Sequence, residues 1–415
     1  DSPVTLLPRA HTSVAQTASV SQLKENYRRL LSRAQEDRAE VSEAFRKAGV
    51  VGPPIVHPFH LQNDWRAFNF SGFPGGVFEG CFGKQNYMLQ FGIQVHFPDK
   101  STKTCFRSFP EINWRLLSRK GHIRVEDVRG DLRGDGTLST FAAALISMLQ
   151  TGYIYAHVNR YFISGTLGFS RWDDRHDVLM IGLDASTAEV FVVVGFDQFG
   201  RYEVKRVPFS LMALSLSSAG GWDENRALAS YNESERACGT WRQPVYHIVP
   251  KMLQESGLNC GMVFSQIGDY LAGTWTSERL LDDSWKAVVT PSRENGVFGL
   301  ASYDLFADHI HERISIGTMN LRPTRALAEH KRQMTARLAM LQRQGVDVPE
   351  RVLSVYRSLS LKCQAIHVAC CSWFIRGSRQ SGLMSWIADL PELQRSERSA
   401  LEELIERNPS ASRHE

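Results

Sequence analysis

The chain lacks several features that would place it quickly in a class of protein. No run of 18 uncharged apolar residues occurs in its 415 residues, so the sequence predicts no transmembrane helix. The 48 basic and 44 acidic residues give a formal net charge of only +4, which argues against a dedicated nucleic-acid binder. The first twenty residues lack the apolar segment of a signal peptide. We therefore expect a cytoplasmic protein without a membrane anchor.

Metal-ligand spacing and nucleotide-binding motifs are missing as well. The seven cysteines are odd in number, scattered, and include no Cys-x-x-Cys pair, which is typical of reduced thiols. No phosphate-binding loop of the form GxxxxGKS/T, no dinucleotide-binding fingerprint and no GxSxG turn is present. Asp173, Asp174 and Asp177 beside His176 offer carboxylates, but adjacent carboxylates in a polar loop are usually solvated. We expect neither a resident cofactor nor a metal.

What the chain does have is a predicted β-hairpin with polar residues at its open end. Val178–Leu183 and Val190–Val194 are apolar and flank a turn-prone segment. His176 stands at the start of the first strand and Asp197 follows the second. Antiparallel pairing brings these ends together, so the two residues are predicted to meet as a base and the carboxylate that orients it. The alternatives are a surface histidine and a turn aspartate.

Cys81 is the candidate nucleophile. The segment CFGKQNYMLQFG is predicted to open a helix with Cys81 near its N-terminus, where free amides and the helix dipole stabilise a thiolate. The alternative is a small buried cysteine, the commoner fate of this residue. Cys105 is a weaker substitute, because it follows a loop-like segment.

The periodicity predicts an α+β fold in three parts. Residues 1–52 form a disordered start and a charged helix, residues 53–215 an α+β domain, and residues 216–415 a mostly helical domain. In the second part a helix over 137–150 packs on an antiparallel sheet. The helices expected in the third part span 245–256, 261–272, 322–344, 352–375 and 396–407. A substrate cleft is expected between the two larger domains.

The order of motifs resembles a known family. A glycine closes a helix at Gly152, a strand ends in Asn159-x-Tyr161, HDVLMIGLD follows, and then VFVVVGFDQFG. IGDYLAG, FGLASYDLFADHI and EHKRQMTARL come later in the chain. This pattern, over roughly residues 75–410, resembles the butirosin biosynthesis protein H-like acyltransferases, whose N-terminal domain is related to papain-like peptidases.

The resemblance implies an acyl transfer chemistry. It makes Cys81 the nucleophile, His176 the general base and Asp197 the orienting residue, with Gln85 or amides after Cys81 at the oxyanion. Asn159, Tyr161 and Tyr303 are expected to contact substrate, although Tyr303 also fits core packing. The GCFGKQNYMLQ segment matches the family's cysteine helix only loosely.

The expected substrate is an acyl or aminoacyl thioester, as in polyketide and nonribosomal peptide biosynthesis. The phosphopantetheine arm belongs to the acyl or peptidyl carrier protein, and the acceptor is an amine or alcohol. The basic stretch 322–337 is a candidate contact for an acidic carrier protein, with a solvated helix face as its alternative. We predict no nucleic-acid or membrane partner, and a homodimer is left open. Three further functions are left open: a thioester hydrolase with His-activated water, a binding or scaffold relative without chemistry, and a peptidase.

Overall fold

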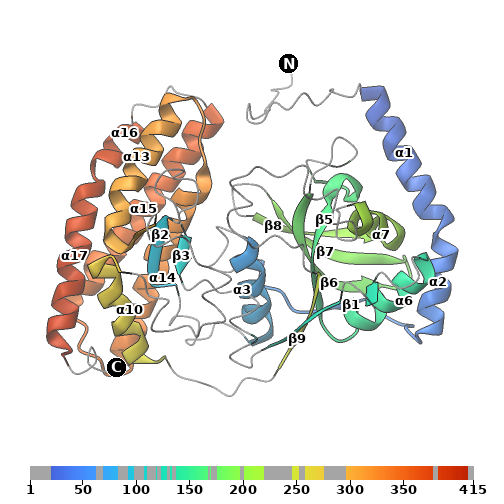
Figure 1. Ribbon diagram of the computed structural model, residues 1–415, viewed down its shortest axis with the longest axis horizontal. Helices are drawn as coiled ribbons and strands as arrows, with labels where there is room; N and C mark the ends of the chain where they lie inside the picture. The colour runs from blue at the N-terminus through green and yellow to red at the C-terminus, as the bar shows by residue number, and fades with distance from the viewer. Residues whose placement is uncertain are drawn as a thin grey trace.

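The fold is α+β, as the sequence predicts, and combines an antiparallel sheet with a separate group of helices (Figure 1). The computed structural model describes residues 20–61, 69–82, 92–97, 107–109, 118, 123–128, 131–132, 137–166, 169, 175–196, 201–218, 245–251, 258–274, 296–376 and 382–409.

Within the described residues the larger sheet has seven strands, all paired antiparallel. Its order is β4-β9-β5-β6-β7-β8, and β1 pairs with the far end of β6. The strands are β1 (Ile55–Val56), β4 (Ile123–Asp127), β5 (Tyr153–Asn159), β6 (Arg175–Asp184), β7 (Glu189–Phe196), β8 (Arg201–Pro208) and β9 (Val245–Pro250). The predicted hairpin is β6 and β7, which pair from Val178 with Val194 to Asp184 with Glu189.

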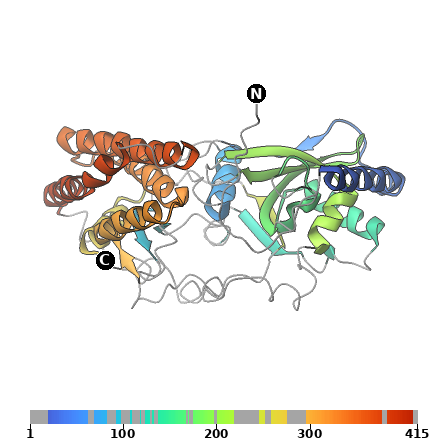
Figure 2. The ribbon, with the colours of Figure 1, turned by 90° about the horizontal axis from the view of Figure 1, so that it is seen from above.

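Helices cover both faces of this sheet (Figure 2). One face buries apolar residues of β5, β6 and β7 against α2, α6 and α7. The opposite face packs on α3 through Phe73, Val77 and Phe78. The helices are α1 (Val20–Glu36), α2 (Arg38–Lys47), α3 (Asn69–Phe82), α6 (Leu138–Leu149) and α7 (Phe209–Ser218). With covers on both faces, all seven residues of β5 are buried.

The other helices of the described ranges form a second core, gathered at the left of Figure 1. They are α10 (Cys260–Ala272), α13 (Ser302–Ser315), α14 (Leu321–Arg343), α15 (Glu350–Arg376), α16 (Gly382–Ala388) and α17 (Leu390–Arg407). A small antiparallel sheet joins this core, in the order β10 (Val297–Phe298), β2 (Gln94–Phe97) and β3 (Arg107–Phe109). The described part of the chain also has the short 3-10 helices η2 (Arg160–Phe162) and η3 (Gly299–Ala301). None of the helices within the described ranges combines the length and apolarity needed to cross a bilayer.

The predicted domain boundary at residue 216 does not match these two cores. β9 lies beyond it and pairs with both β4 and β5 in the larger sheet, whereas β2 lies before it and packs into the helical core through Val95 and Phe97. The chain therefore passes between the two cores more than once. The helix predicted over 245–256 is also wrong, because residues 245–250 form strand β9.

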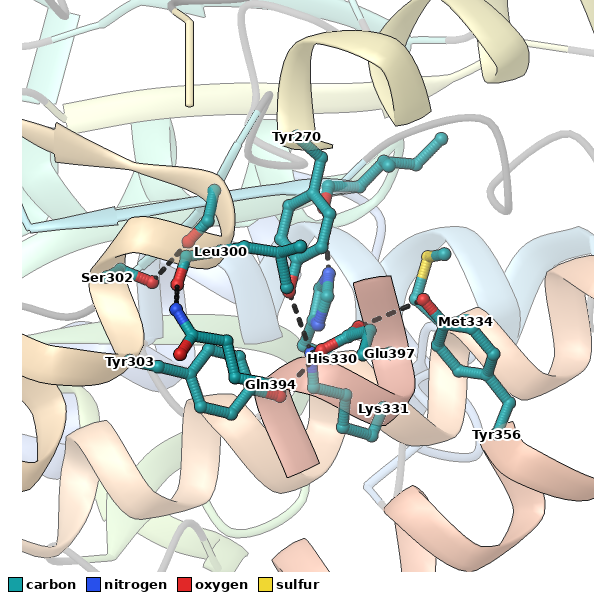
Figure 3. A network of polar contacts seen from close by, with 12 residues as sticks. Tyr270, Leu300, Ser302, Tyr303, His330, Lys331, Met334, Tyr356, Gln394 and Glu397 are labelled. Atoms are coloured by element: carbon teal, nitrogen blue, oxygen red, sulfur yellow. Dashed lines mark hydrogen bonds and ion pairs between the residues drawn. The ribbon is translucent and has the colours of Figure 1, made fainter. Parts of the chain in front are cut away.

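A buried ion pair joins five helices of the second core (Figure 3). Lys331 Nζ on α14 lies 2.6 and 2.7 Å from the two carboxylate oxygens of Glu397 on α17, and both side chains have no solvent exposure. Tyr303 of α13 and Tyr356 of α15 donate hydrogen bonds to Glu397, at 2.6 and 2.9 Å. Tyr270 of α10 accepts one from Lys331 at 2.9 Å.

We expect Glu397→Gln to destabilise the protein by about 3–5 kcal/mol, because it leaves the Lys331 charge buried without its counter-ion. Equilibrium unfolding in urea measures the change. The matched control is Glu392→Gln, which breaks a surface pair with Arg395 on the same helix and should change little. Equal midpoints for the two variants would contradict this role for Glu397.

Gly182 on β6 allows β1 to pair closely, because a Cβ there would overlap the carbonyl oxygen of Ile55. We expect Gly182→Ala to cost about 1–3 kcal/mol through forced displacement of β1. Gly268→Ala on α10 is the control: no atom lies within 4 Å of its added Cβ, and alanine favours a helix by about 1 kcal/mol. Denaturation midpoints should move in opposite directions, and a shared direction would refute the packing argument.

Candidate functional site

A histidine and an aspartate form a close pair at the start of β6. His176 Nδ1 lies 2.6 Å from Asp177 Oδ1, and the two side chains are 27% and 11% exposed. Since a carboxylate only accepts, the imidazole nitrogen is the donor. The contact fixes the ring so that proton exchange with a ligand has to use Nε2. We call His176 and Asp177 the His–Asp dyad.

Two groups of β5 surround Asp177. Tyr155 donates its hydroxyl to Asp177 Oδ2 at 3.3 Å, and His157 pairs with Asp177 in the strand register. Burial and the charge of Asp177 raise the pKa of Tyr155 well above its ordinary value, so it stays a donor. Burial lowers the pKa of His157 despite the nearby Asp177 carboxylate, and His176 lowers it further. His157 is therefore neutral near pH 7.

α3 points its N-terminus toward the dyad's end of the sheet. Phe73, in its first half, packs on Tyr155 and Tyr202, with ring centroids 6.1 and 5.2 Å apart. Cys81, in its last turn, instead contacts Tyr153, which is earlier in β5. From Cys81 back to Phe73 the helix thus advances in the direction of His157 and Asp177. Its positive dipole end favours negative charge on that side.

The position predicted for Cys81 is wrong. It lies near the C-terminal end of α3, not the N-terminal end of a helix, so the dipole does not stabilise its thiolate. Burial raises the pKa of the Cys81 thiol, whose sulfur lies 3.2 Å from the Tyr153 hydroxyl. Because the Tyr153 hydroxyl donates to the Pro58 carbonyl at 2.5 Å, the thiol is the donor to Tyr153. Cys81 is held as a protonated thiol.

The structure does not bring Cys81 to His176. Tyr153, which contacts Cys81, begins β5, whereas Val158, which pairs with His176, is five residues further along. At about 3.3 Å per residue these positions are about 16 Å apart along the strand. A nucleophile and its base need about 2.6–3.2 Å. The predicted Cys81–His176 pair is therefore not assembled.

The other predicted site residues are distributed as follows. Asp197, Gln85 and Cys105 lie outside the described residues; β7 ends at Phe196, directly before Asp197. Asn159 is buried and its side chain accepts the backbone N–H of Tyr161, capping η2. That contact gives Asn159 a local structural role, with Tyr161 half-buried beside it.

Tyr303 and the basic stretch 322–337 serve the helical core instead of the dyad. Tyr303 is buried and bonded to Glu397, which agrees with the core-packing alternative. On α14, Lys331 and Arg337 have no exposure, and Arg325 pairs with Glu329 at 2.7 Å. Burial lowers the pKa of Arg337 to about 9. Lys331 and Arg337 therefore face inward, whereas Arg322 of the same stretch is exposed.

Asp177 is the functional candidate that the sequence reading missed, since it was considered only as a metal ligand. Among the described residues no group of three or more histidine, cysteine or acidic side chains could hold a metal. The signal for Asp177 was its adjacency to His176. Neighbouring residues of a strand usually face opposite sides of the sheet, so a contact between the side chains of His176 and Asp177 was not expected.

Comparison with known proteins adds no family: no family model matches this sequence, and no curated protein matches it.

We expect Asp177→Asn to change the tautomer of His176, because it removes the carboxylate that accepts from Nδ1. Nitrogen-15 NMR of the imidazole ring measures the proportion of each tautomer. Asp184→Asn is the control, since Asp184 is a buried carboxylate at the other end of β6, paired with Arg206. An unchanged His176 spectrum in Asp177→Asn would contradict the dyad.

Proposed function

We propose that this protein processes acyl or aminoacyl thioesters carried by a carrier protein, with His176 as general base and Asp177 as its orienting residue. The base acts directly on a water molecule or an acceptor amine or alcohol, without an acyl group on Cys81. The observation that carries this proposal is the 2.6 Å contact between His176 Nδ1 and Asp177 Oδ1 at a partly exposed strand end.

The arrangement around the dyad supports a papain-like architecture for the sheet half. In such a site a helix packs on one sheet face with its N-terminus toward a histidine on a strand. α3 has that direction, as its contacts with Tyr155 and Tyr153 indicate. The first turn of α3 reads Asn69-Phe-Ser-Gly72 and holds no cysteine. The departure from the family is therefore at the nucleophile, which favours direct attack.

The proposed step balances without a cofactor. His176 Nε2 accepts a proton from water or an acceptor as its oxygen or nitrogen attacks the thioester carbonyl carbon. The carbon–sulfur bond breaks, and the phosphopantetheine thiolate of the carrier leaves with the proton from His176. Asp177 stabilises the imidazolium that forms between the two transfers. The acyl chain is the one that the carrier protein holds, and the acceptor is the second substrate. The phosphopantetheine arm in this step belongs to the carrier protein.

We expect His176→Ala to lower the rate of thioester consumption by about 10²–10⁴-fold, the usual contribution of a general base. The measurement is thiol release from a panel of acyl carrier-protein thioesters, with intact-mass analysis of the enzyme. Cys81→Ala should keep the wild-type rate. His60→Ala is the matched control, because His60 Nδ1 also lies 2.6 Å from a carboxylate oxygen, that of Glu79.

Two outcomes would overturn the proposal. An acyl adduct that disappears in Cys81→Ala would restore a covalent route through that thiol. No consumption by any variant, together with retained carrier binding, would favour a binding relative without chemistry, a class that the remote position of Cys81 also fits.

A further inference from the structure

On α15, in the helical core, a histidine contacts a cysteine. His367 and Cys371 are one helical turn apart, and His367 Nε2 lies 3.7 Å from Cys371 Sγ. His367 Nδ1 lies 2.9 Å from the hydroxyl of Thr324 on α14. His367 is 4% exposed and Thr324 1% exposed, whereas Cys371 is half-buried.

The hydrogen bonds define which nitrogen carries the proton. Thr324 Oγ1 donates to the Leu321 carbonyl at 2.9 Å, so toward His367 it acts as an acceptor. Nδ1 of His367 is then the protonated nitrogen, and the lone pair of Nε2 faces the Cys371 thiol. Burial, with the charge of Arg325, lowers the pKa of His367 to about 4. The imidazole is therefore a neutral acceptor for the thiol proton.

The half-buried Cys371, which packs against the helical core, lies next to an apolar stripe on the surface of α15. Leu361, Val368 and Ile375 follow one another at seven-residue spacing on α15 and are 74%, 52% and 52% exposed. Cys371 is three residues after Val368 and four before Ile375, so it lies on the same side of the helix. From Leu361 to Ile375 the stripe runs about 21 Å, at 1.5 Å per residue. Such a surface suits an extended hydrocarbon chain.

We propose that Cys371 is a covalent acyl-acceptor site, in which His367 is the base and the stripe holds the acyl chain. The Cys371 sulfur attacks the carbonyl carbon of an acyl thioester and gives its proton to His367 Nε2. The bond from that carbon to the donor sulfur breaks, and the donor thiolate leaves with the proton from His367. The product is an acyl thioester on Cys371. This site is separate from the dyad and does not rest on its function.

The test uses decanoyl-coenzyme A as donor and locates adducts by intact mass and peptide mapping in the full-length protein. In the wild type, Cys371 should acylate about 10²-fold faster than Cys260. Cys260 is another half-buried thiol; it contacts Gln344 and Leu258, and burial raises its pKa. Cys371→Ser should remove the adduct, and Cys370→Ser should keep it. His367→Gln should slow it by about 10²-fold.

A surface variant keeps the test independent of folding. Val368→Asp changes an exposed residue and should abolish the preference for decanoyl over acetyl donors while leaving acetylation unchanged. Equal labelling of Cys371 and Cys260 in the wild type, or an unaltered chain preference in Val368→Asp, would overturn the proposal. Loss of the Cys371 adduct in His176→Ala would also overturn it, because acyl delivery would then come from the dyad.

Discussion

The contact between Lys331 and Glu397 is the point at which five helices of the second core meet. A fully buried ion pair stabilises a fold only when its remaining hydrogen-bonding groups have partners, and three tyrosines from three helices supply them here. The geometry fixes α14 against α15, since Lys331 and Tyr356 reach the same carboxylate. The same packing places Thr324 opposite His367. The Lys331–Glu397 ion pair and the Thr324–His367 hydrogen bond thus depend on one helix interface.

In the sheet half, the constraint is β5, which is buried along its whole length and paired on both sides. A strand so enclosed cannot shift its register without turning every side chain to the wrong face. Tyr153 and Cys81 therefore stay at one end, and His157 and the dyad at the other. Along the strand, the positions of Tyr153 and Val158 are about 16 Å apart. This is why Cys81, the cysteine predicted as the nucleophile, does not lie beside His176.

The sequence predicted those helices and strands whose formation depends on the pattern of apolar residues within the segment itself. The hairpin of β6 and β7, with His176 near its start, followed from two apolar segments on either side of a turn. The helices α6, α10 and α14 followed from apolar spacing. β9 was missed because its identity depends on pairing with strands a hundred residues away. α3 was missed because its proline and glycines are poor helix formers. Burial of Phe73, Val77 and Phe78 on the sheet overrides that propensity, and Gly80 lets residue 58 approach its backbone.

The two histidines differ in the group that orients the imidazole ring: a carboxylate for His176 and a hydroxyl for His367. This difference fits the different acids from which the two histidines are proposed to take a proton. Asp177 is an anion and would stabilise the imidazolium formed in the proposed step, in which His176 takes a proton from water, a very weak acid. Thr324 is neutral and offers His367 no such stabilisation, while burial and Arg325 hold the pKa of His367 at about 4. A thiol, with an ordinary pKa of about 8.5, needs far less help to lose its proton. The dyad is therefore suited to activating water or an amine, and His367 to directing the proton of Cys371.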